Sequence, residues 1–315
     1  MEDIKKYDVI LVGGGCAAMA SAIYTCRAEL KTLMLERKFV GGQVVITTDV
    51  DNYPGFPDGI QGPELTERMR KQAERFGTDI KSEEVVSLSV DGLKKTVTTD
   101  EGVYESPIVI LAMGADPRKL EVPGEAELTG RGVSYCGTCD GPFYRGKDVF
   151  VVGGGSSAIT EAIFITKFVN KLTVVHRRDT LRAEKILQTE AFENPKMSFI
   201  WDSVVESIDG QEKVEGVTIN NLKTGQKDKL PCGGVFVFVG NQPNTGFLDN
   251  LFSVDAGSHI EANHKMETSV EGIFAIGDVR KNSFRQIATA VGDGVTAAIA
   301  AQHKIADMKA KGGLL

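Results

Sequence analysis

Two stretches of the chain share the same order of apolar and polar positions. The first has an apolar run at residues 9–12, glycines at 13–15, a helical pattern over residues 19–27 and a second apolar run at 32–35. A change from continuous apolar residues to a helical period and back predicts strand, helix and strand. The glycines mark the turn between the first strand and the helix, so the stretch is predicted to be a βαβ unit.

The same order recurs about 140 residues later. Here the apolar runs are residues 149–152 and 172–175, the glycines are 153–155 and the helical pattern covers 159–169. This interval is far too long for a solenoid repeat and indicates two related nucleotide-binding domains. The predicted fold class is therefore α/β, with two Rossmann-like dinucleotide-binding domains.

Two segments, one between these units and one after the second unit, have the composition of linkers. A predicted strand pair over residues 103–113 ends at Gly114 and is followed by Pro117, while an apolar strand at 235–239 leads into residues 240–244, which contain glycine and proline. If both segments are linkers, the central domain is inserted into the first. We therefore expect one discontinuous domain of residues 1–115 plus 246–315, and a central domain of residues 116–245.

Composition narrows the choice of partners. The chain has 315 residues and a net charge of -7, so it lacks the clustered positive charge with which proteins bind nucleic acid or anionic membranes. No apolar run is long enough to span a bilayer. The first residues lack the apolar region of a signal peptide, and the cysteine count of five is odd, which together favour a cytoplasmic protein with mostly reduced thiols.

The glycine turns are predicted to bind pyrophosphate groups. A strand that feeds a glycine turn and then a helix directs backbone N–H groups and the positive helix end at a phosphate. One such turn could be tight packing without a ligand, but two copies in matching contexts favour nucleotide binding. The candidate residues in the two turns are Gly13, Gly15, Ala18, Gly153, Gly155, Ser156 and Ser157.

The residues that end each second strand differ between the copies. Glu36 follows the first, where a carboxylate accepts hydrogen bonds from both ribose hydroxyls and repels a 2′-phosphate. His176, Arg177 and Arg178 follow the second, with Arg182 close behind. Arginines match the geometry of phosphate, so this site is expected to prefer NADPH to NADH. The alternatives are a solvated glutamate and a plain basic surface, with His176 as a packing or stacking residue.

Between the two turns lies a Cys-x-x-Cys pair, Cys136 and Cys139. Such a pair is half of a zinc site, a redox disulfide or a coincidence. Zinc needs further ligands, but the other cysteines are scattered and the four histidines show no metal-ligand spacing, so no metal is expected. Asp140 follows the pair and either exchanges protons with a departing thiolate or shapes a turn. A hydride donor and a disulfide acceptor need a mediator, and a flavin is one.

Together these segments resemble the low-molecular-weight, flavin-dependent thioredoxin reductases over essentially the whole chain. The resemblance rests on the two glycine turns, the dithiol with Asp140, and residues 41–43, 52–55, 176–185 and 277–278. It implies that FAD is held by the N- and C-terminal segments, that NADPH is held by the central domain, and that the chain forms a homodimer. It also implies that Cys139 faces the flavin and that Cys136 attacks the partner's disulfide.

The resemblance adds FAD-binding residues to those of the first turn and Glu36. They are Gly42, Gln43, Asn52, Asp278, Arg285, Gln286 and Ile287. Asp278 is expected to hydrogen-bond the ribityl-phosphate region, and residues 285–288 are expected to lie against the isoalloxazine ring. The chain departs from the family at residues 16–18, which read Cys-Ala-Ala where relatives commonly have Pro-Ala-Gly, and at Ser156 and Thr160.

The resulting hypothesis is a cytoplasmic enzyme that passes electrons from NADPH through FAD and the dithiol to a thioredoxin-like protein. One alternative is a flavin-dependent oxidase of small dithiols, which needs no NADPH. Another is a thioredoxin reductase fed by ferredoxin or a deazaflavin; such relatives typically lack the arginines. A third, from a different class, is a non-catalytic redox sensor that binds both nucleotides without turnover.

Overall fold

The protein divides into two compact units, which are described separately. The computed structural model describes residues 4–47, 49–248 and 251–312. Unit 1 comprises Met1–Asp116 with Gln242–Leu315, and unit 2 comprises Pro117–Asn241. The first boundary lies one residue from the expected position and the second lies four residues earlier than expected. The two segments that connect the units, β11 (Ala115–Pro117) and β20 (Asn241–Pro243), pair as a two-stranded sheet. The chain therefore returns from unit 2 to unit 1 within β20, before residue 245.

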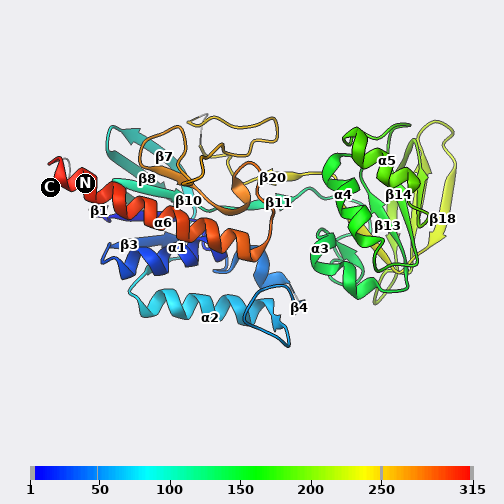
Figure 1. The fold of residues 1–315 in the computed structure, drawn as a ribbon, viewed down its shortest axis with the longest axis horizontal. Coiled ribbons are helices and arrows are strands. Elements are labelled where there is room, and N and C mark those ends of the chain that lie inside the picture. Colours follow the sequence, from blue (N-terminus) through cyan, green and yellow to red (C-terminus); the bar gives the residue numbers. More distant parts are fainter. Residues whose placement is uncertain (1–3, 48, 249–250, 313–315) are drawn as a thin grey trace. The chain divides into compact units, whose positions relative to one another are not determined.

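A five-stranded parallel sheet forms the centre of unit 1 (Figure 1). Its order is β21 (Ile273–Ala275), β10 (Ile108–Leu111), β2 (Val9–Val12), β3 (Thr32–Leu35) and β6 (Asp79–Lys81). The residues of β2, β3 and β10 are buried throughout. Burial on both faces explains why these strands read as continuous apolar runs rather than alternating ones.

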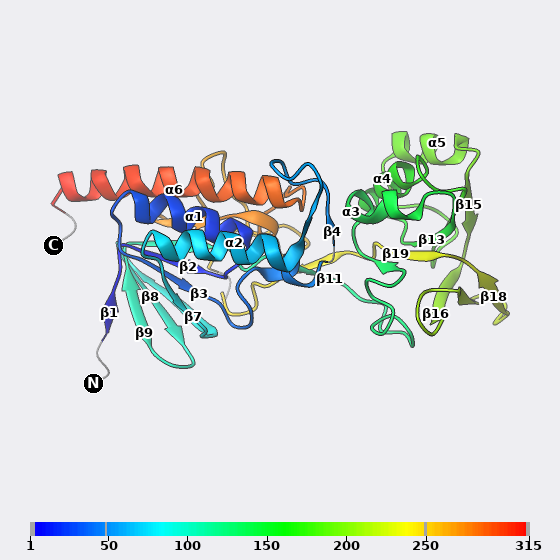
Figure 2. The same cartoon turned by 90° about the horizontal axis from the view of Figure 1, so that it is seen from below.

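Different layers cover the two faces of this sheet (Figure 2). Alternate residues such as Val9 and Leu11 pack in one core with the helices, which are α1 (Cys16–Arg27), α2 (Gly62–Arg75) and α6 (Ile287–Ala310). Ile10 and Val12 pack in a second core against a four-stranded sheet. That sheet has the order β1 (Lys5–Lys6), β9 (Val103–Ser106), β8 (Lys94–Thr99) and β7 (Val85–Asp91).

Short elements at the strand ends complete unit 1. They are the 3₁₀ turns η1 (Gly42–Ile46) and η3 (Gly277–Val279) and the paired strands β4 (Asp49–Val50) and β5 (Ile60–Gln61). Helix α6 packs closely on α1, because a Cβ on Gly294 would lie 2.2 Å from the Ala17 carbonyl oxygen. A larger residue at position 294 would therefore separate the two helices.

Unit 2 repeats the same layered plan. Its parallel sheet has the order β12 (Val133–Ser134), β19 (Gly234–Val237), β13 (Asp148–Val152), β14 (Lys171–Val175) and β15 (Met197–Ile200). The helices α4 (Ser156–Ile165) and α5 (Lys185–Glu193) pack in one core with this sheet. A three-stranded antiparallel sheet of β16 (Ser203–Asp209), β17 (Gly216–Asn221) and β18 (Lys227–Pro231) contributes to the core on its other face. The dithiol segment forms α3 (Gly137–Asp140) and the 3₁₀ turn η2 (Gly141–Tyr144).

The predicted α/β fold class is confirmed, with differences at helix ends. Helix α1 begins at Cys16, three residues before the predicted start, because the glycine turn leads directly into it. Helix α4 ends at Ile165 rather than at residue 169, because the N–H groups of Lys167 and Phe168 donate to carbonyls three residues back, as in a closing turn. In the described part of the chain, no helix has both the length and the apolar character required to cross a membrane.

Candidate functional site

The first glycine turn leaves the N-terminus of α1 open. Gly13 has a φ of +102°, and a Cβ there would lie 2.5 Å from the Ala112 carbonyl oxygen. A Cβ on Gly14 would lie 2.9 Å from the Cβ of Glu36. Gly15 instead faces open space within 4 Å and provides the N-cap of α1 without a side-chain cap. The turn thus requires glycine at 13 and 14 for packing, while the bare end of the helix at Gly15 suits a phosphate.

The predicted residues around this turn converge in unit 1. Glu36 accepts hydrogen bonds from the backbone N–H groups of Gly14 at 2.7 Å and Lys38 at 2.9 Å, one on each carboxylate oxygen. Each oxygen keeps a further acceptor site for a ribose hydroxyl. Gly42, with a φ of +60°, brings the following loop against the turn, where its Cβ would lie 3.3 Å from the Cα of Gly15. Ala18 is fully buried in the first turn of α1.

Asp278 reaches the same region from the end of β21. Burial raises the pKa of its carboxyl group, and the Ser283 hydroxyl opposes this shift by donating to Oδ1 at 2.9 Å. Burial also raises the pKa of the neighbouring Cys16 thiol to about 12, and the charge of Asp278 adds to that shift. Cys16, which occupies the position of the family's proline, is therefore a neutral thiol that fills space rather than a nucleophile.

A buried ion pair that the sequence did not reveal holds the Asp278 turn. Asp293 on α6 accepts from Arg280 Nε at 2.6 Å, from Arg280 Nη2 at 2.9 Å and from the Gly277 backbone N–H at 3.0 Å. The side chains of Asp293 and Arg280 are only 8% and 18% exposed. The pair thus ties η3 to α6 on both sides of Asp278.

Replacing Asp293 is expected to destabilise unit 1. Asp293→Asn leaves the partly buried Arg280 guanidinium without its counter-charge, which costs about 3 kcal/mol of the free energy of unfolding. Urea denaturation followed by circular dichroism measures the loss. Glu261→Gln is the control, because it removes an exposed 2.7 Å pair with Lys281 and should cost less than about 1 kcal/mol. Equal losses in the two variants would contradict the structural role of the buried pair.

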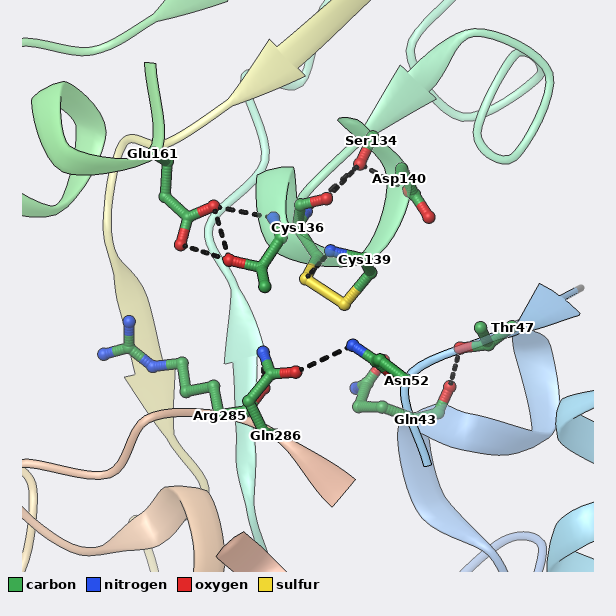
Figure 3. The surroundings of a disulfide bond; sticks show 11 residues. Gln43, Thr47, Asn52, Ser134, Cys136, Cys139, Asp140, Glu161, Arg285 and Gln286 are labelled. Carbon is green, nitrogen blue, oxygen red and sulfur yellow. Dashed lines mark hydrogen bonds between the residues drawn. A yellow bond between two sulfur atoms is a disulfide. The ribbon is translucent and has the colours of Figure 1, made fainter. Parts of the chain in front are cut away.

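The remaining predicted residues of unit 1 lie in the loops around η1 and β4 and at the start of α6. Asn52 Nδ2 donates to Gln286 Oε1 at 3.1 Å across a sequence separation of 234 (Figure 3). Gln43 Nε2 donates to Asp116 Oδ1 at 2.5 Å. Gln286 is the N-cap of α6, which has no side-chain cap, and Ile287 is its first residue. Arg285 is exposed and adopts a positive φ of 55°.

The second glycine turn, in unit 2, has the same construction as the first. A Cβ on Gly153 would lie 2.4 Å from the Phe238 carbonyl oxygen, whereas one on Gly155 would meet nothing within 4 Å. Gly155 is the N-cap of α4, again without a side-chain cap. Ser156 accepts from the Glu184 N–H at 3.1 Å, and Ser157 is exposed. The open helix end again suits a phosphate group.

His176 and the arginines lie differently beside this turn. The His176 ring is 5% exposed and packs where a Cβ on Gly154 would be, 2.5 Å from the ring nitrogen Nδ1. Burial lowers its pKa, as do the charges of the three arginines. Arg177, Arg178 and Arg182 are exposed, and no ion pair found within the described ranges uses them. The Arg182 N–H donates to the Gly154 carbonyl at 2.7 Å, which joins this cationic segment to the turn.

Cys136 and Cys139 form a disulfide at the start of α3, with their Cα atoms 5.3 Å apart. Cys136 is the N-cap of this short helix, and the Cys139 N–H donates to its Sγ at 3.1 Å. Both residues are partly exposed. Because an N-terminal helix turn favours negative charge, the geometry suits a Cys136 thiolate once the disulfide is reduced.

Asp140 lies beside the disulfide on the same turn (Figure 3). The Ser134 hydroxyl donates to Asp140 Oδ2 at 2.6 Å, and Ser134 Oγ also accepts from the Cys136 N–H at 3.1 Å. Burial raises the pKa of Asp140, and the hydrogen bond from Ser134 offsets part of this shift. The carboxyl group can therefore keep a proton at a higher pH than an exposed aspartate. Ser134 was not predicted, although its place two residues before the first cysteine was visible in the sequence.

Glu161 is a second carboxylate at the dithiol that the sequence did not single out. It extends from α4, and its Oε2 accepts from the Thr138 backbone N–H at 2.9 Å (Figure 3). The only signal available was an acidic residue in a helix whose neighbours Ile159, Ala162 and Ile165 are fully buried.

Comparisons with known proteins identify the family of the chain. Residues 7–294 match the family model described as pyridine nucleotide-disulphide oxidoreductase. The thioredoxin reductase of Bacillus subtilis (strain 168) is 46% identical over 98% of this chain and 98% of its own length. The thioredoxin reductase of Treponema pallidum (strain Nichols) is also 46% identical, over 95% of this chain and 97% of its own length. The solved thioredoxin reductase of Streptococcus pyogenes MGAS5005 is 47% identical, covers 97% of this chain and 100% of its own, and has a TM-score of 0.90. The resemblance inferred from the motifs is thereby confirmed.

Proposed function

Because the chain belongs to the pyridine nucleotide-disulphide oxidoreductase family, we propose that it is a cytoplasmic, homodimeric thioredoxin reductase that uses NADPH and FAD. In this proposal electrons pass through the Cys136–Cys139 disulfide to a thioredoxin-like protein. The observation that carries the proposal is the disulfide at the N-cap of α3, next to the partly buried carboxyl group of Asp140. The same unit contains an open glycine turn beside three exposed arginines that make none of the ion pairs found among the described residues, so the proposed donor site and the dithiol belong to one folded body.

Membership in the family implies a flavin and a pyridine nucleotide, and we assign FAD to unit 1. The bare end of α1 at Gly15 would face the pyrophosphate, and Glu36 would bind the adenosine ribose. Asp278 would bind the ribityl-phosphate region. We assign the remaining predicted contacts to the ring and its surroundings, namely those of Gly42, Gln43, Asn52, Arg285, Gln286 and Ile287. Bound FAD would supply the two-electron chemistry that couples a hydride donor to a disulfide.

We assign NADPH to unit 2. The bare end of α4 at Gly155, with Ser156 and Ser157, would face the pyrophosphate. The exposed Arg177, Arg178 and Arg182 would bind the 2′-phosphate, since guanidinium groups bind phosphate in bidentate geometry. The buried His176 ring would pack against the turn at Gly154 rather than bind the nucleotide, since a side chain at position 154 would collide with the ring.

The residues of the dithiol can complete the transfer by thiol–disulfide exchange. Reduction with uptake of one proton opens the S–S bond and leaves a thiolate and a thiol. The Cys136 thiolate would attack the partner's disulfide, forming a mixed disulfide and releasing one partner thiolate. Cys139, once deprotonated, would attack Cys136 Sγ and release the second partner thiolate. Asp140 would exchange protons with these thiols, because burial keeps its carboxyl group protonated to a higher pH.

An anaerobic titration tests the proposal. NADPH is added to the purified protein and should bleach the flavin absorbance, which should recover when an oxidised thioredoxin is added. Absence of bleaching by NADPH but bleaching by reduced ferredoxin would replace the donor and keep the dithiol. Recovery only with a small disulfide or with oxygen would favour the dithiol oxidase, and no bleaching by any donor would favour a redox sensor. Light scattering tests the homodimer, which a monomeric mass would refute.

Removing the acid beside the dithiol is expected to change the pH dependence of turnover. Asp140→Asn keeps the shape and an acceptor for Ser134 but cannot hold the proton, so kcat should fall about 10²-fold. Since the wild-type carboxyl group has a raised pKa and acts as an acid when protonated, wild-type kcat should decline as pH rises through that pKa. The Asn variant should lack this decline. A pH profile of kcat that keeps its shape in the variant would assign the proton transfer to another group.

A further inference from the structure

We propose that Glu161 tunes the reduction potential of the Cys136–Cys139 pair and makes it a stronger reductant than the same turn without this carboxylate. The inference rests on the proposed function, because it concerns the dithiol that would reduce the partner. Glu161 would act through the backbone of the dithiol turn and through its charge, so it is a positioning residue rather than a catalytic one.

The contact between α4 and the dithiol turn is specific. Glu161 Oε2 accepts from the Thr138 N–H at 2.9 Å, and both carboxylate oxygens lie 3.4 Å from the Thr138 hydroxyl (Figure 3). Gly137 makes this approach possible, since a Cβ there would lie 2.5 Å from Glu161 Oε2 and 2.9 Å from Ile165 Cδ1. Glycine is therefore required at position 137, because a larger residue would exclude the Glu161 carboxylate from the dithiol turn.

Glu161 occupies a donor that would otherwise stabilise a thiolate. The first-turn N–H groups of a helix favour negative charge at its N-cap, and the N-cap of α3 is Cys136. Of these donors, the Cys139 N–H is directed at Cys136 Sγ, but the Thr138 N–H is engaged by Glu161. The carboxylate thus withdraws one donor from the sulfur and adds a negative charge beside it.

The second carboxyl group at the turn does not have this effect to the same degree. Asp140 is partly buried, its pKa is raised, and its Oδ2 accepts from Ser134 rather than from a first-turn N–H group. Tyr144 on η2, whose pKa burial raises to about 12, is a neutral phenol near Asp140. Glu161 is therefore the carboxylate whose charge bears on the N-terminus of α3.

The sign of the effect on the redox equilibrium follows. Reduction breaks the S–S bond, adds two electrons and one proton, and leaves one thiolate and one thiol. A nearby negative charge and a missing N–H donor disfavour the thiolate, so they favour the disulfide and lower the reduction potential. A dithiol with a lower potential reduces a given partner disulfide more completely.

The experiment compares Glu161→Gln and Glu161→Ala with the wild-type protein. Each is equilibrated at one pH with mixtures of reduced and oxidised dithiothreitol, quenched with acid and alkylated, and the reduced fraction is measured by mass spectrometry. Glu161→Gln removes the negative charge but keeps the shape and an acceptor for the Thr138 N–H. We expect the equilibrium to shift about tenfold toward the dithiol, which is about 30 mV for a two-electron couple. Glu161→Ala also frees the N–H and should shift it further.

Glu212→Gln is the matched control. It makes the same charge change at an exposed position in the turn between β16 and β17 of the same unit and should leave the potential unchanged. Shifts of less than about twofold in both Glu161 variants, or shifts toward the disulfide, would overturn the inference. If the Ala variant fails to fold, the result of the conservative Gln variant decides the test. Dithiothreitol reacts with the dithiol directly, so this measurement does not depend on NADPH. A wild-type protein that is not reduced by NADPH would refute the proposed function, and the reduction potentials of the variants could still be compared.

Discussion

Replacing either cysteine of the dithiol with serine is expected to lower NADPH-driven thioredoxin reduction by about 10⁴-fold or more. The disulfide is the group that accepts electrons and passes them on in the proposed function, and serine can form neither a disulfide nor a thiolate. Losses of this size are typical when a nucleophile is removed. The turnover of Cys136→Ser and Cys139→Ser is measured with NADPH and oxidised thioredoxin, alongside Cys26→Ser, a control in which a free, partly exposed cysteine is replaced. Undiminished turnover in Cys136→Ser would reject the mechanism.

The same variants separate the roles of the two sulfurs. If Cys136 attacks the partner, Cys139→Ser should accumulate a mixed disulfide with oxidised thioredoxin, because no second thiol is present to resolve it. Cys136→Ser should not accumulate this species. Non-reducing electrophoresis and mass spectrometry detect the adduct, and an adduct formed only by Cys136→Ser would exchange the two assignments.

Most of the fold was predictable because its signals are local. Continuous apolar runs, glycine turns and helical periods each lie within about 30 residues, and the second copy of the pattern supported the first. Both predicted glycine turns lead into a helix whose N-terminus is open, at Gly15 and at Gly155. The helix limits were less accurate, since backbone turns such as the one that follows Ile165 leave little trace in side-chain pattern.

The supporting residues of the site were not predictable in the same way. Arg280 and Asp293 are ordinary charged residues in the sequence, and only packing of η3 on α6 makes them a buried pair. Glu161 lies 23 positions from Thr138, and nothing in the spacing relates the two. Chemistry that depends on residue type, such as the dithiol, is visible in one sequence, whereas support through long-range contacts requires the fold.

Removing the arginines beside the second glycine turn is expected to abolish the preference for NADPH. Arg177, Arg178 and Arg182 are exposed and make none of the ion pairs found in the described part of the chain, so their guanidinium groups are available for a 2′-phosphate. Hydrogen bonds to charged groups contribute about 1.5–3 kcal/mol each. The double variant Arg177→Ala/Arg178→Ala should therefore lower kcat/KM for NADPH about 10²- to 10⁴-fold. Its kcat/KM for NADH should change by less than about threefold, because NADH lacks the phosphate.

Steady-state rates with the two nucleotides at low ionic strength measure this difference. Lys213→Ala is the control, since it removes an exposed positive charge from the turn between β16 and β17 of the same unit and should affect both nucleotides equally little. Equal losses with NADPH and NADH in the arginine variant would mean that the arginines bind a part shared by both nucleotides. No loss with either would remove the arginines from the donor site, and a donor other than a pyridine nucleotide would then be tested against the same disulfide.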